Sequence, residues 1–178
     1  DAANRDRGEV LLVAVTKTRP LDDVRALYEL GVRDFAENRV QDVRDRIPEF
    51  HDNATWHFIG HLQTNKTKYL PGLIEVVHSV DRVDVLDALQ KTWEKVPAVA
   101  PLRILLEFNI AKEAQKTGAD AADALALLKH ARTCGRLTVD GLMTMAPYSD
   151  NAEDARPVFR ALRELRDNLQ QQTGIALP

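Results

Sequence analysis

The chain has 178 residues, a length typical of one domain with a substantial hydrophobic core. Its formal net charge of -3 at pH 7 gives no electrostatic signature of a protein that binds nucleic acid or an anionic membrane. No apolar run approaches the roughly 20 residues that cross a bilayer, and no secretory signal is visible. The single cysteine, Cys134, cannot form an internal disulfide and is expected to pack in the interior of a cytoplasmic protein.

Strands and helices are predicted to alternate along the whole chain. Residues 9–15 are predicted to form a strand that is apolar throughout after Glu9, a pattern typical of a strand buried on both faces. An amphipathic helix follows it and stops at Gly31. The same order then repeats. The predicted strands are residues 9–15, 33–36, 56–59, 74–80, 103–108 and 139–145, and the predicted helices are residues 21–30, 39–47, 64–70, 81–93, 120–131 and 152–171.

Strand-then-helix units with short connections predict a parallel sheet in a single domain that spans residues 1–178. Two architectures compete for this pattern. A doubly wound sheet can stop at this number of strands, whereas a (β/α)8 barrel has two more units and about 250 residues. Length favours the open sheet, but residues 16–20 after the first strand contain no glycine-rich turn, which argues against its nucleotide-binding versions.

In parallel α/β folds the functional site lies at the carboxyl ends of the strands, where this chain places polar side chains. Lys17 follows the first strand. A lysine that loses its solvent there would have a lowered pKa and could attack a carbonyl as a neutral amine, although a lysine at a strand end is commonly just solvated. The other candidates at strand ends are Thr16, Glu37, Asn38, His57, Gly60, His61, His78, Ser79, Asp81, Arg82, Glu107, Asn109, Met143, Thr144 and Met145.

Several of these residues also have purely structural interpretations. Asn38 and Asp81 each precede a predicted helix and could cap it, and Asp81 favours that interpretation. His57 and His61 have the spacing of helical zinc ligands, but that spacing spans a strand and a glycine, so no metal site is expected. Met143 and Met145 point the same way on a predicted strand, and methionines in that position are more often core residues than ligand contacts. No serine has the surroundings of a hydrolase nucleophile.

Five sequence segments resemble the pyridoxal-phosphate homeostasis proteins, also called the YggS or proline-synthetase co-transcribed family. LVAVTKTRP at residues 12–20 resembles the strand that carries the cofactor lysine, and FAENRVQD at residues 35–42 resembles a second motif. WHFIGHLQTNK at residues 56–66 is similar to the most distinctive signature of the family. HSVDR at residues 78–82 and GLM at residues 141–143 follow in the family's order.

The resemblance implies a protein that binds pyridoxal 5'-phosphate in a (β/α)8 TIM-type barrel of the alanine racemase kind. It implies that Lys17 forms a Schiff base with the cofactor, and that Asn38 and Met143 lie near the bound ring. It further implies a monomer without established turnover, which carries or buffers the cofactor. Pyridoxal-phosphate-dependent apo-enzymes are its candidate recipients.

The chain departs from the family pattern at three points. Ala36 and Thr16 replace a common glycine and a common serine, and we expect little effect from either change. The helix that normally precedes the first strand is absent. The chain ends at Pro178, before the Ser-Met-Gly-Met-Ser and Gly-Ser/Thr-x-x-Arg-x-Gly stretches of the family. We therefore expect an incomplete barrel of about six units, truncated before its last two strands and open at a sheet edge.

Two other functions remain open on the sequence. The first is a pyridoxal-phosphate-dependent racemase or decarboxylase of the same barrel class. A racemase needs an acid or base on each face of the ring, and Tyr28, Tyr69 and Tyr148 lie on predicted helices or in a loop, which favours a carrier over an enzyme. The second is a non-catalytic interaction module. Against it, the last predicted helix mixes both charge signs, as solvated faces do, and leaves no spare apolar stripe.

Overall fold

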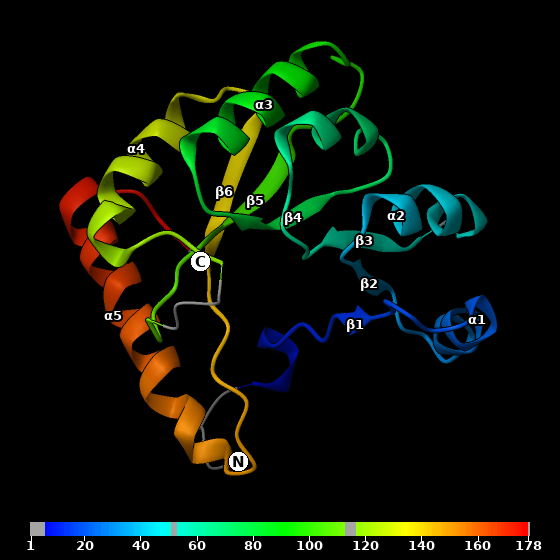
Figure 1. The fold of residues 1–178 in the computed structure, drawn as a ribbon, viewed down its shortest axis with the longest axis horizontal. Coiled ribbons are helices and arrows are strands. Elements are labelled where there is room, and N and C mark those ends of the chain that lie inside the picture. The colour runs from blue at the N-terminus through cyan, green and yellow to red at the C-terminus, as the bar shows by residue number, and fades with distance from the viewer. Residues whose placement is uncertain (1–5, 51–52, 113–116, 178) are drawn as a thin grey trace.

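A computed structural model of the chain, which describes residues 6–50, 53–112 and 117–177, contains a six-stranded parallel sheet. Its strands lie side by side in sequence order, and the helices cover the outer side of the arc that they form (Figure 1). A doubly wound sheet would reverse its strand order and carry helices on both faces. The sequential order therefore favours a section of a (β/α) barrel over the open doubly wound sheet. The strands are β1 (Ala14–Val15), β2 (Asp34–Glu37), β3 (Thr55–Phe58), β4 (Val76–Val80), β5 (Leu102–Glu107) and β6 (Leu137–Met143).

The helices follow the predicted order with small changes at their ends. The α-helices of the described residues are α1 (Leu21–Glu29), α2 (Val40–Arg46), α3 (Val83–Glu94), α4 (Ala124–Thr133) and α5 (Arg156–Thr173). Between β3 and β4 the predicted helix is a 3-10 helix, η3 (Thr64–Tyr69). The remaining 3-10 turns are η1 (Arg7–Glu9), η2 (Ile47–Glu49), η4 (Ala121–Asp123) and η5 (Ala152–Ala155).

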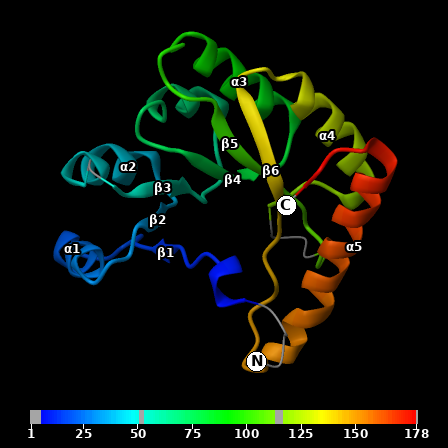
Figure 2. The same cartoon turned by 180° about the vertical axis from the view of Figure 1, so that it is seen from behind.

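The first strand is much shorter than its sequence predicts. Only Ala14 and Val15 pair with β2, and the preceding residues Val10, Leu11 and Leu12 are 62%, 62% and 79% exposed. The prediction of a strand over residues 9–15 that is buried on both faces is therefore wrong for the described structure. The reason is positional, because β1 is an edge strand with β2 as its only partner, so apolar residues in this run have no second neighbour to cover them. Figure 2 shows the two edges, β1 and β6, on either side of the opening of the arc.

The hydrophobic core lies between the sheet and its helices. An aromatic group fills it near β2 and β3, where the rings of Phe35 and Trp56 stack with centroids 5.3 Å apart and Phe50 contacts both. Cys134 is buried in the same continuous core, as predicted. Burying these rings stabilises the packing around β2 and β3. No helix in the described part of the chain is both long and apolar enough to cross a membrane.

Candidate functional site at the carboxyl ends of the strands

Lys17 lies in a tight turn directly after β1. The turn is closed by a hydrogen bond from the Arg19 amide to the Thr16 carbonyl, 3.0 Å long, and Thr18 adopts a left-handed conformation with φ of 65°. Lys17 is exposed, and it forms no hydrogen bond or ion pair with the described residues. The Lys17 amine is therefore free to bind a ligand at the carboxyl end of β1. The apolar covering that we expected to desolvate it is not supplied by the described residues, because β1 is short and at the edge of the sheet.

Two buried side chains, Thr16 and Glu37, and the half-buried Arg46 hold this turn against β2. The Thr16 hydroxyl donates to Oε1 of Glu37 over 2.6 Å, and Glu37 is fully buried. Arg46 of α2 donates both to Glu37 Oε1, at 3.1 Å, and to the Thr16 carbonyl, at 2.9 Å. Burial raises the pKa of the Glu37 carboxyl, and the Thr16 hydrogen bond and the Arg46 charge partly oppose that rise. The backbone that carries Lys17 is therefore tied to the second strand through its immediate neighbour.

Asn38 directly follows β2 and meets the loop after β3. A Cβ atom at Gly60 would lie 2.0 Å from the Asn38 carbonyl oxygen, so only glycine permits this approach of the two backbones. The N-cap of α2 is Arg39, so the interpretation of Asn38 as a helix cap is wrong. The described residues offer no hydrogen-bond partner to the half-buried Asn38 side chain, which leaves its amide available to a ligand.

The loop after β3 is held in turn by the end of β4. The Ser79 hydroxyl donates to the Gly60 carbonyl at 2.5 Å, and Arg82 donates to the Leu62 carbonyl at 2.8 Å. Arg82 also pairs with Asp81 at 2.7 Å, and the N-cap of α3 is Arg82, so the predicted capping role of Asp81 is wrong. The segments at residues 35–42, 56–66 and 78–82 therefore contact one another in sequence order along the carboxyl ends of the strands.

Met143 ends β6 at the same edge and is half-buried. Its carbonyl accepts from the Phe108 amide at 2.9 Å, and the Thr144 hydroxyl donates to the Phe108 carbonyl at 2.8 Å. Met143 is paired in register with Glu107, the last residue of β5. The thioether thus lies at the carboxyl end of the strand that is farthest from Lys17 along the sheet order.

Glu107 is a second buried acid at the carboxyl ends of the strands, where the sequence placed it without assigning it a specific role. It is 3% exposed and accepts a hydrogen bond from the Thr117 hydroxyl at 2.7 Å. Burial raises the pKa of its carboxyl, the Thr117 hydrogen bond opposes that rise, and the nearby charges of Asp81 and His61 act in opposite directions. Carboxyls with a raised pKa occur in sites that transfer protons and also in structural networks, and Glu37 shares this property.

His57 and His61 do not form the pair that their spacing suggests. His57 is buried, and its Nδ1 lies 2.8 Å from Nε2 of His78 while its Nε2 lies 3.2 Å from Asp34. Burial, with the nearby His57 and Arg103, lowers the pKa of His78 to about 4, and burial also lowers the pKa of His57. Both rings are therefore neutral at pH 7, and two hydrogen bonds in series link His78 to His57 and His57 to Asp34. His61 instead is exposed and lines a neighbouring pocket.

A second group of potential metal ligands lies away from this edge, between α3 and α4. Asp87, His130 and Cys134 place their ligand atoms within 4.8 Å of one another. His130 Nε2 lies 2.7 Å from Asp87 Oδ1, so a hydrogen bond between these two side chains accounts for most of this proximity. The sequence could not show the group, because Asp87 and His130 meet only when the two helices pack side by side.

The chain matches a known protein family and a curated relative over most of its length. The family model described as alanine racemase, N-terminal domain, matches residues 2–178. A curated relative from Aquifex aeolicus, named pyridoxal phosphate homeostasis protein, is 39% identical over 100% of this chain and 78% of its own length.

Solved structures agree with these sequence relatives. PipY of Synechococcus elongatus, solved with pyridoxal phosphate bound, has a TM-score of 0.84 and 29% identity, covering 97% of this chain and 80% of its own. Alanine racemase of Clostridium difficile has a TM-score of 0.79 at 7% identity, over 97% of this chain and 45% of the racemase, and so shares the fold. The fold of the chain is that of the alanine racemase N-terminal barrel.

Proposed function

We propose that this chain, which belongs to the pyridoxal phosphate homeostasis family built on the alanine racemase N-terminal domain, binds pyridoxal 5'-phosphate and carries or buffers it. Lys17 is the residue that tethers the cofactor, and Asn38 and Met143 contact it. The observation that carries this proposal is the placement of a free, exposed primary amine on a turn that buried side chains hold at the carboxyl edge of the sheet.

The side chains at this edge fit such a cofactor. Pyridoxal phosphate supplies an aldehyde that condenses with a primary amine and a ring that withdraws electrons. Lys17 offers the amine, and the unpartnered amide of Asn38 offers a donor and an acceptor for a polar ring substituent. Met143 offers a polarizable, partly covered surface for the ring edge. The absence of a Cβ at Gly60 allows the Asn38 backbone to lie close to the loop after β3.

A carrier must also release its bound cofactor. Lys17 is exposed, so an incoming amine from solvent can reach the same position and displace it. We therefore expect release of the cofactor to be accelerated by amino acids, with delivery to pyridoxal-phosphate-dependent apo-enzymes. The proposal places a monomer in the cytoplasm, where a buried free thiol such as Cys134 stays reduced.

Equilibrium binding and transfer test this role. The protein is loaded with pyridoxal phosphate and mixed with an apo-enzyme that depends on the cofactor, and the recovery of enzyme activity is followed with time. We expect transfer from the unaltered protein, and neither stable loading nor transfer above free-cofactor controls for Lys17→Ala. Equal loading and equal transfer by Lys17→Ala would overturn the proposal.

A pyridoxal-phosphate-dependent racemase or decarboxylase is the second candidate. The observation in its favour is Glu107, a buried carboxyl of raised pKa at the same edge, which could act as the second proton-transferring group. A steady-state assay against a panel of amino acids separates the two functions. Turnover that is lost in both Lys17→Ala and Glu107→Gln would establish an enzyme, whereas loading without turnover supports the carrier.

A further inference from the structure

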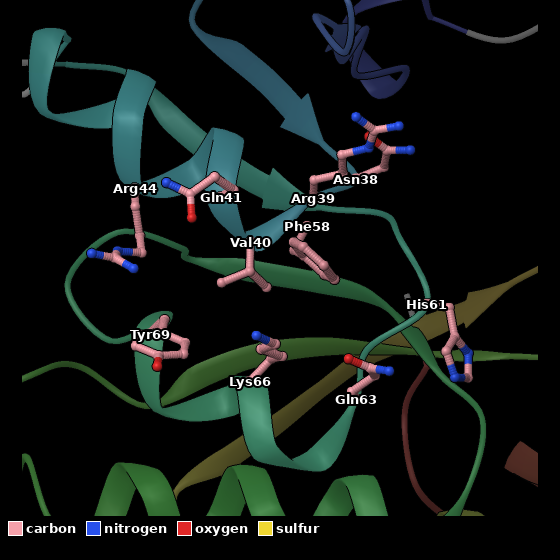
Figure 3. A pocket seen from close by; sticks show the side chains of 10 residues that line it. All are labelled: Asn38, Arg39, Val40, Gln41, Arg44, Phe58, His61, Gln63, Lys66 and Tyr69. Atoms are coloured by element: carbon pink, nitrogen blue, oxygen red, sulfur yellow. The ribbon is translucent and has the colours of Figure 1, made fainter.

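A pocket of about 310 Å³ lies between α2 and η3, beside the edge that carries Lys17. Two sequence segments form it, residues 38–44 on one side and residues 58–69 on the other, as Figure 3 shows. Asn38, which the proposed function places against the cofactor, lines this pocket, whereas Lys17 does not. The polar end of the WHFIGHLQTNK run, including Gln63 and Lys66, faces it. The proposed function uses Gly60 of that run but gives no role to this polar end.

Positive charge gathers around one aromatic ring in this pocket. The Arg44 guanidinium lies 5.2 Å from the centroid of the Tyr69 ring, and the Lys66 ammonium lies 5.9 Å from the same centroid. Lys68, just outside the pocket, lies 5.0 Å from it. Figure 3 shows Arg44 descending from α2 and Lys66 rising from η3, with Tyr69 below Arg44.

No carboxylate of the described residues neutralises these three cations. Arg44, Lys66 and Lys68 have no ion pair within the described chain, and the nearby Asp45 accepts a hydrogen bond from Gln41 at 2.9 Å. Like charges around one ring repel one another, and attraction to the ring face offsets only part of that repulsion. An anion between Arg44 and Lys66 would relieve it.

We propose that this pocket binds a phosphate group, as inorganic phosphate or a small phosphate monoester. Arginine offers a planar fork to phosphate oxygens, and lysine adds a compact charge. Gln63 and Tyr69 add neutral donors from η3 and its N-terminal flank, and no acidic side chain lines the pocket. The volume lies at the lower end of the range for small-ligand sites, which suits a small anion rather than a peptide.

Isothermal titration with inorganic phosphate, at constant ionic strength set with KCl, tests this site. We expect Arg44→Gln and Lys66→Gln each to weaken phosphate binding about tenfold, the usual consequence of losing one charge-assisted hydrogen bond. Lys129→Gln, a matched change of an exposed lysine on α4, is expected to leave the affinity unchanged. A parallel titration with phenyl phosphate separates the two sources, since tighter binding of the ester indicates a phosphate monoester and equal binding indicates free phosphate.

An NMR titration of the unaltered protein makes the test independent of how the variants fold. Phosphate should shift the side-chain amide signals of Gln63 and the ring signals of Tyr69. Shifts confined to another basic surface, such as that of Arg160 and Arg163 on α5, would overturn the proposal. So would tighter binding of malonate than of phosphate, or unchanged affinity in both pocket variants. Because Lys17 is intact throughout, failure here would leave the proposed carrier function standing.

Discussion

Replacing Arg46 with methionine should destabilise the protein by removing the cationic partner of the buried Glu37 carboxylate. The Glu37 side chain is fully buried and the Arg46 side chain is 19% exposed, so their pair is largely shielded from water. Arg46→Met removes one hydrogen bond to Glu37 and one to the Thr16 carbonyl. Breaking a buried pair from one side costs on the order of 3 kcal/mol in unfolding free energy, which corresponds to a fall in Tm of roughly 6–12 °C for a chain of this size.

The pH dependence of this loss has a defined sign. Burial already raises the pKa of Glu37, and removing the Arg46 charge removes an influence that lowers it. The folded variant therefore holds a proton on Glu37 more tightly than the unfolded chain does, so its stability falls as pH rises. Urea denaturation should show a larger loss for Arg46→Met at pH 8 than at pH 5.

A second substitution and a control complete the test. Arg46→Met combined with Glu37→Gln should recover most of the lost stability, because glutamine leaves no buried charge. Arg163→Met, an exposed arginine on α5, should change the unfolding free energy by less than about 0.5 kcal/mol. A loss below about 1 kcal/mol for Arg46→Met at pH 8, or additive losses in the double variant, would refute the reasoning.

Two further predictions concern the strand ends and the inner histidines. Gly60→Ala should lower the unfolding free energy measured by urea denaturation by about 3 kcal/mol or more, because the new Cβ would lie 2.0 Å from the Asn38 carbonyl oxygen. Gly135→Ala is the control, because a Cβ there meets nothing within 4 Å. Equal losses in the two variants would contradict the packing argument. Because the pKa of His78 is lowered to about 4 in the folded state, stability should fall as pH drops below about 6.5, by an amount on the order of 2–3 kcal/mol near pH 4. His78→Gln should flatten that part of the stability curve measured by urea denaturation, and an unchanged acid limb would show that His78 is not its source.

The alternation of strands and helices could be predicted from the sequence because periodicity is a local property. Apolar spacing within residues 21–30 and 81–93 is enough to indicate a helix, and both helices form within one or two residues of those limits. The extent of the first strand could not be predicted in the same way. An apolar run over residues 9–15 indicates burial, but burial depends on a neighbouring strand, which β1 has only on the side of β2.

In the candidate site, too, the positions of residues along the chain could be predicted from the sequence, whereas the contacts between distant segments could not. The sequence placed Lys17 and Asn38 after their strands, where the structure also has them. It could not show that Glu37 accepts from Thr16 or that His57 pairs with His78, because each contact joins residues 21 positions apart through the register of the sheet. For the same reason the sequence could not show that positive charges surround Tyr69, because Arg44 and Lys66 come from different segments.

The identity of the reacting amine is the central claim, and trapping it is the direct measurement. The protein is incubated with pyridoxal phosphate, reduced with borohydride, weighed intact by mass spectrometry and then digested to locate the modified residue. The account predicts one cofactor adduct per chain, on the peptide that contains Lys17, and none on Lys17→Ala under conditions that saturate the unaltered protein. An adduct of equal yield on Lys17→Ala, or one located on a different lysine of the unaltered chain, would contradict it.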